Sequence, residues 1–155
     1  MTNPSDVCNG CTACAMRCTA GIKMAEIEYL RILEELRSMN PQAAHRVLSQ
    51  PKEQPWFEEI TYTACIFLDM HSHLCLIYPA RPLICRLFGR IRHLPCPLEL
   101  APPDLHHEHL LQLYTEQPLR TFQEWMMGQG IFNFDDLLGV AREIPMFELE
   151  EGMRD

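Results

Sequence analysis

Residues 8–18 read CNGCTACAMRC, with four cysteines at C-x2-C-x2-C-x3-C spacing. The chain of 155 residues has eight cysteines in all, and the other four are spread over the segment 65–96. Disulfides between such close thiols would close only very short loops, so their entropic contribution to stability is small. A thioredoxin-like dithiol lies where a strand meets a helix in a βαβ unit, and the sequence predicts no such unit. Ligation of metal by thiolates is therefore the favoured interpretation.

The composition is that of an ordinary globular protein, with 47% hydrophobic residues, 22% charged residues and a net charge of −8. A chain of this length is expected to form one domain. We predict a single metal-stapled domain over residues 1–147 and an acidic tail over 148–155. No secretory leader and no run of roughly 18–20 apolar residues is visible, so we expect a cytoplasmic protein without membrane association. The negative charge disfavours general nucleic acid binding.

The hydrophobic pattern predicts a mainly α-helical fold with irregular metal-binding loops and one small β-hairpin. Pro41 and Pro82 are expected to begin helices, because proline is favoured at the first helical position. We expect helical structure over residues 22–40, 41–49, 81–88, 104–117, 118–127 and 134–143. The hairpin is expected to pair residues 63–69 with 74–78, where β-branched and aromatic residues flank the sequence MHSH.

Two kinds of metal centre suit thiolates at these spacings. A Zn²⁺ ion binds four tetrahedral sulfur or nitrogen ligands, usually from two cysteine pairs far apart in the sequence. A [4Fe–4S] cluster takes several thiolates from one loop, as in the ferredoxin run, although Thr19 stands here where ferredoxins have proline. We favour an iron–sulfur cluster over zinc, because the triple C-x2-C-x2-C wraps a cube more readily than a single ion. Multinuclear zinc–thiolate sites nevertheless use the same spacing.

We predict that both sets of cysteines contribute to one or two metal centres. The tight loop is expected to supply about three ligands to one centre, and a distal cysteine to complete it. The predicted ligands are Cys8, Cys11, Cys14, Cys18, Cys65, Cys75, Cys85 and Cys96.

The second half of the chain carries a more specific pattern. Residues 65–88 read C-x-F-L-D-x5-C-x-I-Y-x2-R-P-x2-C-R-x-F. With residues 8–18, this block resembles the YkgJ-like CxxCxxCC cysteine-cluster family, described as a zinc- or iron-chelating domain and similar to the cysteine-rich part of flagellin lysine N-methylases. The resemblance implies metal or iron–sulfur binding but no activity, because those methylases are considerably longer chains. The family pattern ends in two adjacent cysteines, whereas Ala15 follows Cys14 here, so Cys18 is a candidate for the missing ligand.

Arg81 and Arg86 are predicted to lie beside the bound centre. Thiolates around a divalent core carry net negative charge, and neighbouring cations and hydrogen bonds tune its stability and reduction potential. The alternative for both arginines is surface ion pairing with Asp69 or a glutamate. Asp69 and Tyr78 are expected to hold the hairpin rather than to take part in chemistry.

Other side chains are weaker candidates. His71 and His73 lie between two cysteines and are possible substitute ligands. A further histidine group, expected to be an exposed first helical turn, consists of His106, His107 and His109. An aromatic and methionine patch near GQG is expected to pack in the core, with a partner-binding groove as the alternative. It comprises Phe122, Trp125, Met126, Ile131, Phe132 and Phe134.

Three functions fit these features. The first is a metalloprotein with a [4Fe–4S] cluster in a redox, sensing or assembly role, working with a protein partner. The second is a zinc-stapled structural or protein-interaction module. The third, a methyltransferase-related enzyme, rests on family analogy alone, since the sequence has no glycine-rich nucleotide loop and no nucleophile–base pair.

Overall fold

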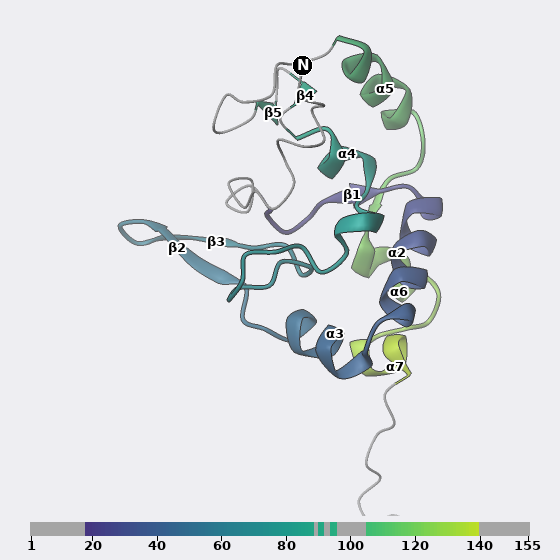
Figure 1. Cartoon of the computed structure of the whole chain (residues 1–155). Helices are drawn as coiled ribbons and strands as arrows, with labels where there is room; N and C mark the ends of the chain where they lie inside the picture. Colours follow the sequence, from purple (N-terminus) through teal and green to yellow (C-terminus); the bar gives the residue numbers. More distant parts are fainter. Residues whose placement is uncertain (1–17, 89, 92–93, 96–104, 140–155) are drawn as a thin grey trace, which may run out of the picture.

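Figure 1 shows a computed structural model of the chain, which describes residues 18–88, 90–91, 94–95 and 105–139. The helices are α2 (Glu26–Ser38), α3 (Pro41–Leu48), the 3-10 turn η2 (Tyr78–Ala80), α4 (Leu83–Arg86), α5 (Leu105–Thr115), α6 (Phe122–Gly128) and α7 (Phe134–Leu138). The strands are β1 (Lys23–Met24), β2 (Glu53–Phe57), β3 (Ile60–Thr63), β4 (Arg90–Ile91), β5 (Leu94–Pro95) and β6 (Arg120–Thr121). They pair antiparallel as β1–β6, β2–β3 and β4–β5. The predicted mainly helical fold with a small sheet is thus confirmed.

Local sequence explains where the predicted helices begin. The carboxylate of Glu28 accepts a hydrogen bond from the backbone N–H of Ala25, which precedes α2, at 3.1 Å. The side chain of Asn40 accepts from the N–H groups of Gln42 and Ala43, and Pro41 occupies the start of α3. Both arrangements satisfy amide groups that have no partner inside the helix.

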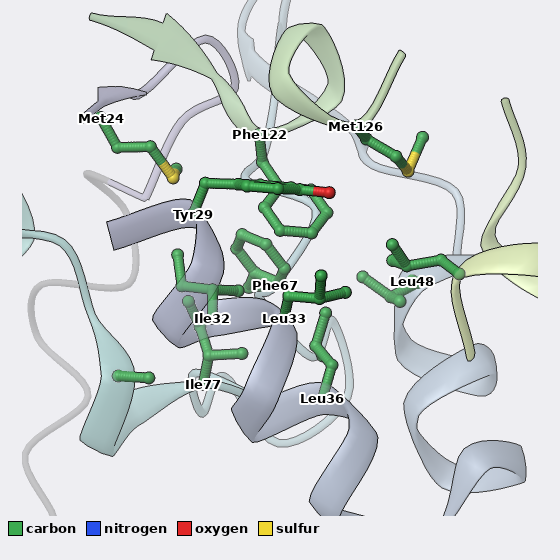
Figure 2. Packing of buried hydrophobic residues seen from close by; sticks show 12 residues of the cluster. Met24, Tyr29, Ile32, Leu33, Leu36, Leu48, Phe67, Ile77, Phe122 and Met126 are labelled. Atoms are coloured by element: carbon green, nitrogen blue, oxygen red, sulfur yellow. The ribbon is translucent and has the colours of Figure 1, made fainter. Parts of the chain in front are cut away.

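The core forms around one face of α2 (Figure 2). Its residues Tyr29, Ile32, Leu33 and Leu36 recur every three or four positions and are all buried. Aromatic rings then extend the core: the ring centroid of Phe122 lies 5.0 Å from that of Tyr29 and 5.1 Å from that of Phe67. The full cluster comprises Met24, Tyr29, Ile32, Leu33, Leu36, Leu48, Phe67, Ile77, Ala80, Phe122, Met126 and Leu137. Segments from α2 to α7 therefore share a single core.

The predicted aromatic patch is largely part of this core. Phe122 and Met126 are buried, and partly buried side chains packed against the cluster include Trp125, Ile131 and Phe134. The indole N–H of Trp125 also donates to the carbonyl of Met24 at 2.8 Å, which ties α6 to β1. Phe132 differs, because 72% of its surface is exposed.

The hairpin predicted for residues 63–69 and 74–78 is wrong. No strand ladder forms between those segments, and turns fill much of both. An isolated bridge joins Leu68 to Cys75, and backbone hydrogen bonds join Asp69 to Leu74 and Leu76 to Phe67. Phe67 and Leu68 are both buried although they are adjacent, which a strand with one buried face does not allow. The hairpin that does form, β2–β3, projects from the body of the fold (Figure 1) and includes Pro55. Proline is tolerated there because both strands of a two-stranded sheet are edge strands.

The domain limits of 1–147 stay a prediction, and the acidic tail at 148–155 lies outside the described residues. The helix predicted for 134–143 is described as far as residue 139, where Gly139 ends α7 with a φ of 68°. Within the described ranges, no helix has both the length and the apolar character that crossing a membrane requires.

Candidate metal centre

Backbone pairing places Cys18 directly beside Cys65. The N–H of Cys65 donates to the carbonyl of Cys18 at 2.7 Å, and the next residues, Thr19 and Ala64, form an antiparallel bridge. The end of the tight cysteine run and the first distal cysteine are therefore neighbours, although they are 47 positions apart in the sequence.

Cys65 and Cys75 lie on two segments that run side by side at the edge of the core. The N–H of Leu76 donates to the carbonyl of Phe67 at 2.8 Å, next to the bridge between Leu68 and Cys75. Phe67 and Leu68 are buried, so the apolar residues of the motif anchor this loop to the core.

Cys85 is held by the short helix α4. Its backbone N–H donates to the carbonyl of Pro82 at 3.0 Å, and the N–H of Leu87 donates to the carbonyl of Leu83, also at 3.0 Å. Leu87 is buried, and Cys65, Cys75 and Cys85 are partly buried free thiols.

The thiols share one electrostatic environment. Burial raises the pKa of Cys65 and of Cys75 to about 11 each, and the charge of Cys75 also acts on Cys65. The pKa of Cys75 is raised further by the charge of Cys18. Burial raises the pKa of Cys85 as well, and charges on Cys65, Cys18 and Cys75 add to that effect. The four cysteines thus form one group of interacting sulfurs, which we call the thiol group.

Two cations oppose this accumulation of negative charge. The guanidinium of Arg81 lowers the pKa of both Cys75 and Cys85, and the ammonium of Lys52 lowers the pKa of Cys65. Lys52 is held in place because its Nζ donates to the carbonyls of Val47, at 2.8 Å, and Leu68, at 2.6 Å. Burial lowers the pKa of Lys52 itself, against the influence of Cys65 and Asp69.

The two arginines differ in their contacts. The guanidinium carbon of Arg81 lies 3.8 Å from the ring centroid of Tyr78, and its Nε donates to the Tyr78 carbonyl at 3.1 Å. Arg86 is exposed and its Nε donates to the carbonyl of Arg81 at 2.9 Å. The ion pair with Asp69, predicted as the alternative for both arginines, is made by Arg46, with 3.7 Å between its Nη2 and the carboxylate Oδ2. Arg81 therefore contacts Tyr78 and acts on the pKa of Cys75 and Cys85, and Arg86 supports the backbone of Arg81.

Asp69 organises the loop between Cys65 and Cys75. Its Oδ1 accepts from the side-chain amide of Gln50 and from the N–H of His71, each at 3.0 Å. These hydrogen bonds hold the pKa of the Asp69 carboxyl well below its usual range, and the hydrogen bond from Gln50 has the largest effect. Gln50 also accepts from the N–H of Met70 at 2.9 Å, so this one side chain, just after α3, binds the loop at two adjacent residues.

A family match covers the whole cysteine region. The model of the CxxCxxCC family, described as "Putative zinc- or iron-chelating domain", matches residues 7–116. The chain belongs to this family. No curated protein and no solved structure matches the chain.

The resemblance to the CxxCxxCC family inferred from the sequence is thereby confirmed, and all eight cysteines fall inside the matched range. Part of the core lies beyond it, since α6 and α7 contribute Phe122, Met126 and Leu137. These helices follow residue 116 and complete the packing around the family domain.

The described part of the CxxCxxCC domain, which includes four of its eight cysteines, does not complete a centre by itself. Among the described residues, no group of three or more His, Cys, Asp or Glu side chains has the geometry to hold a metal ion. The predicted ligands Cys8, Cys11, Cys14 and Cys96 lie outside the described residues.

The histidines contribute little to the thiol group. His71 and His73 are exposed on the loop, where His73 has a φ of 59° and donates its N–H to the Asp69 carbonyl at 2.8 Å. His109 is exposed on α5. His106 and His107 belong to the same helix, but the structure describes only their backbone.

Three side chains around the site were not found from the sequence: Lys52, Gln50 and Glu28. Lys52 is one of only two lysines, but nothing in its spacing from Cys65 along the chain predicts that the two residues lie close together. Glu28 stands three residues after Ala25, which lacks the side-chain oxygen of a capping box. Their roles depend on contacts between distant segments, which no local pattern reports.

Proposed function

We propose that this protein holds one or two metal centres through thiolates from both cysteine sets, with at least one [4Fe–4S] cluster, in a redox, sensing or assembly role. The observation that carries the proposal is the thiol group. Backbone pairing places Cys18 beside Cys65, the bridge from Leu68 reaches Cys75, and charges on all three of these cysteines raise the pKa of Cys85. Membership of a family of metal-chelating domains supports the same conclusion.

The arrangement suggests how the ligands divide. Cys18 is bonded through its backbone to Cys65, so we assign it to the thiol group rather than to the tight loop. Cys8, Cys11, Cys14 and Cys96 would complete that centre or form the second one. This assignment differs from three loop ligands completed by one distal cysteine.

Charge around the thiol group suits a metal–thiolate centre. Four thiolates around Zn²⁺ or [4Fe–4S]²⁺ carry a net charge of about −2. Lys52 and Arg81 supply one positive charge each near the group, since Lys52 acts on Cys65 and Arg81 on Cys75 and Cys85. Arg86 would support the centre indirectly by holding Arg81.

A zinc-stapled interaction module is the second candidate. The observation that favours it is the exposure of apolar side chains on α2 and α5, which would suit a protein partner. Those side chains are Ile27, Leu30, Leu110 and Leu113. In this case Zn²⁺ would stabilise the cysteine segments without redox chemistry.

Anaerobic purification with iron, zinc and sulfide analysis tests the proposal. We expect a brown protein with absorbance near about 400 nm and about four iron and four sulfide per cluster. A colourless protein with one or two zinc ions per chain would select the interaction module instead. A full-length protein that binds neither metal, even after anaerobic reconstitution, would refute both candidates.

Cys18→Ser tests the ligand assignment. If Cys18 belongs with the distal cysteines, this variant and Cys85→Ser should lose the same metal or cluster, with the same change in spectrum. Cys8→Ser is the control from the tight run. A Cys18→Ser spectrum that matches that of Cys8→Ser and differs from that of Cys85→Ser would contradict the assignment.

A further inference from the structure

We infer that Glu28 is a positioning residue that fixes Cys85 in the thiol group by binding the first amide of α4. The inference rests on the proposed function, because Cys85 is one of the proposed metal ligands. It deepens that function by adding a determinant of ligand geometry from α2, a helix that carries no cysteine.

Both oxygens of the Glu28 carboxylate are engaged by different segments. Oε2 accepts from the backbone N–H of Leu83 at 2.5 Å. Oε1 accepts from the N–H of Ala25 at 3.1 Å and from the phenol of Tyr114 on α5. Tyr114 is buried, and its hydroxyl oxygen also accepts from the Ala25 N–H at 3.2 Å. One carboxylate therefore joins the starts of α2 and α4 to α5.

The bond to Leu83 determines where Cys85 lies. Leu83 opens α4, and Cys85 is two residues further along the same turn. The Pro82 carbonyl accepts from the N–H groups of both Cys85 and Arg86, at 3.0 and 3.2 Å. The backbone from Pro82 to Arg86 thus forms one hydrogen-bonded turn, and Glu28 binds the first amide of that turn.

The helix that supplies Glu28 is itself firmly placed. Tyr29 and Ile32 of α2 are fully buried in the core. One turn after Glu28, the guanidinium of Arg31 donates to the carbonyl of Pro79 at 3.3 Å, and α2 packs against η2. Two polar side chains of α2 therefore hold the segment that links Cys75 to Cys85. Burial of Ile77 and Ala80 anchors the middle of this segment in the core, and the two polar contacts fix its position beside α2.

Substitutions that change the number of acceptor oxygens at position 28 distinguish this positioning role from a general contribution to stability. A carboxylate accepts hydrogen bonds on both oxygens, whereas a glutamine amide accepts on one only. Glu28→Ala removes both acceptors, whereas Glu28→Gln keeps one and withdraws the other from either the Leu83 amide or the Tyr114 hydroxyl. Glu28→Asp keeps both acceptors on a shorter side chain. Glu26→Gln is the matched control, because Glu26 is exposed in the same first turn of α2.

The experiment compares these full-length variants in two anaerobic measurements. The first is the rate at which iodoacetamide alkylates each cysteine of the metal-free protein, resolved by mass spectrometry. The second is Co²⁺ titration, followed by the thiolate charge-transfer absorption. For Glu28→Ala we expect severalfold faster alkylation of Cys85, unchanged rates at Cys65 and Cys75, and Co²⁺ binding weakened by roughly 10–100-fold. Glu28→Asp should recover part of both effects, and Glu26→Gln should match the wild type.

The outcomes separate the inference from the proposed function. A wild type that binds neither Co²⁺ nor iron would refute the metal centre, while the alkylation rates would still test the placement of Cys85. Wild-type alkylation rates in Glu28→Ala would overturn the inference even if metal binds. Faster alkylation at all three cysteines with loss of helical circular dichroism would also overturn it, because Glu28 would then be a general stability residue.

Discussion

The core around α2 and the cysteine segment 65–87 are in contact but are ordered by different interactions. The core consists of apolar side chains at helical spacing, and Tyr29, Ile32 and Leu36 have no exposed surface. The cysteine segment contains two short helical pieces and one isolated bridge, and its cysteines are only partly buried. It is held both by its own buried side chains, such as Phe67 and Ile77, and by polar side chains from elsewhere, namely Gln50, Lys52 and Glu28.

This difference indicates that the core and the cysteine segment have different roles. Burial of apolar surface stabilises the core without any ligand. The cysteine segment concentrates thiols whose ionisation is opposed by burial and by one another. Such a site gains stability when a metal neutralises the thiolates. The core therefore acts as a scaffold that presents loops suited to a ligand.

The largest expected effect lies in the core. Ile32→Ala removes a fully buried side chain from α2 and should lower the free energy of unfolding by about 2–5 kcal/mol. Ile27→Ala is the matched control on the same helix, because Ile27 is 70% exposed, and it should change stability by less than about 0.5 kcal/mol. Urea denaturation of the metal-free protein measures both. Equal effects of the two variants would contradict the assignment of the buried face.

A smaller effect is expected in the cysteine segment. Asp69→Asn keeps an acceptor for Gln50 and His71 but removes the negative charge, so we expect a loss of about 1 kcal/mol at pH 7. The Asp69 pKa is lowered in the folded state by the Gln50 and His71 hydrogen bonds, with Arg46 adding to them. The negative charge of Asp69 therefore makes its full contribution to stability at pH values above about 4, which is the pKa of an aspartate in the unfolded chain.

That contribution is lost as the pH falls from about 4 through the lowered folded pKa. The difference in urea midpoint between wild type and Asp69→Asn should accordingly shrink below about pH 4. A difference that grows on acidification would show that the pKa of Asp69 is raised rather than lowered.

The smallest effect is expected at the rim of that segment. Arg46→Ala removes an ion pair with 3.7 Å between charged atoms and a largely exposed arginine. Such pairs contribute little because water screens them, so the loss should stay below about 0.5 kcal/mol. Thermal unfolding at low and high salt measures the effect. A loss as large as that of Asp69→Asn would mean that the ion pair, rather than the hydrogen bonds, holds the loop.

The sequence predicted the helical part of this architecture and missed most of the loop part. The spacing of Tyr29, Ile32 and Leu36 is a local signal, and so is a proline after Asn40. The hairpin was misplaced because β-branched and aromatic residues at 63–69 and 74–78 serve as anchors in the core rather than as alternating strand residues.

The sequence by itself determined the family, the helices and the types of residue that suit a metal centre, because these follow from residue identity and short spacing. The tertiary structure decided which of those residues meet. Backbone pairing brings Cys18 to Cys65, and folding of α2 across the core brings Glu28 to the start of α4. The same folding carries Lys52 to the loop near Cys65. Such contacts join residues far apart in the chain, so they depend on packing of the whole core rather than on any local pattern.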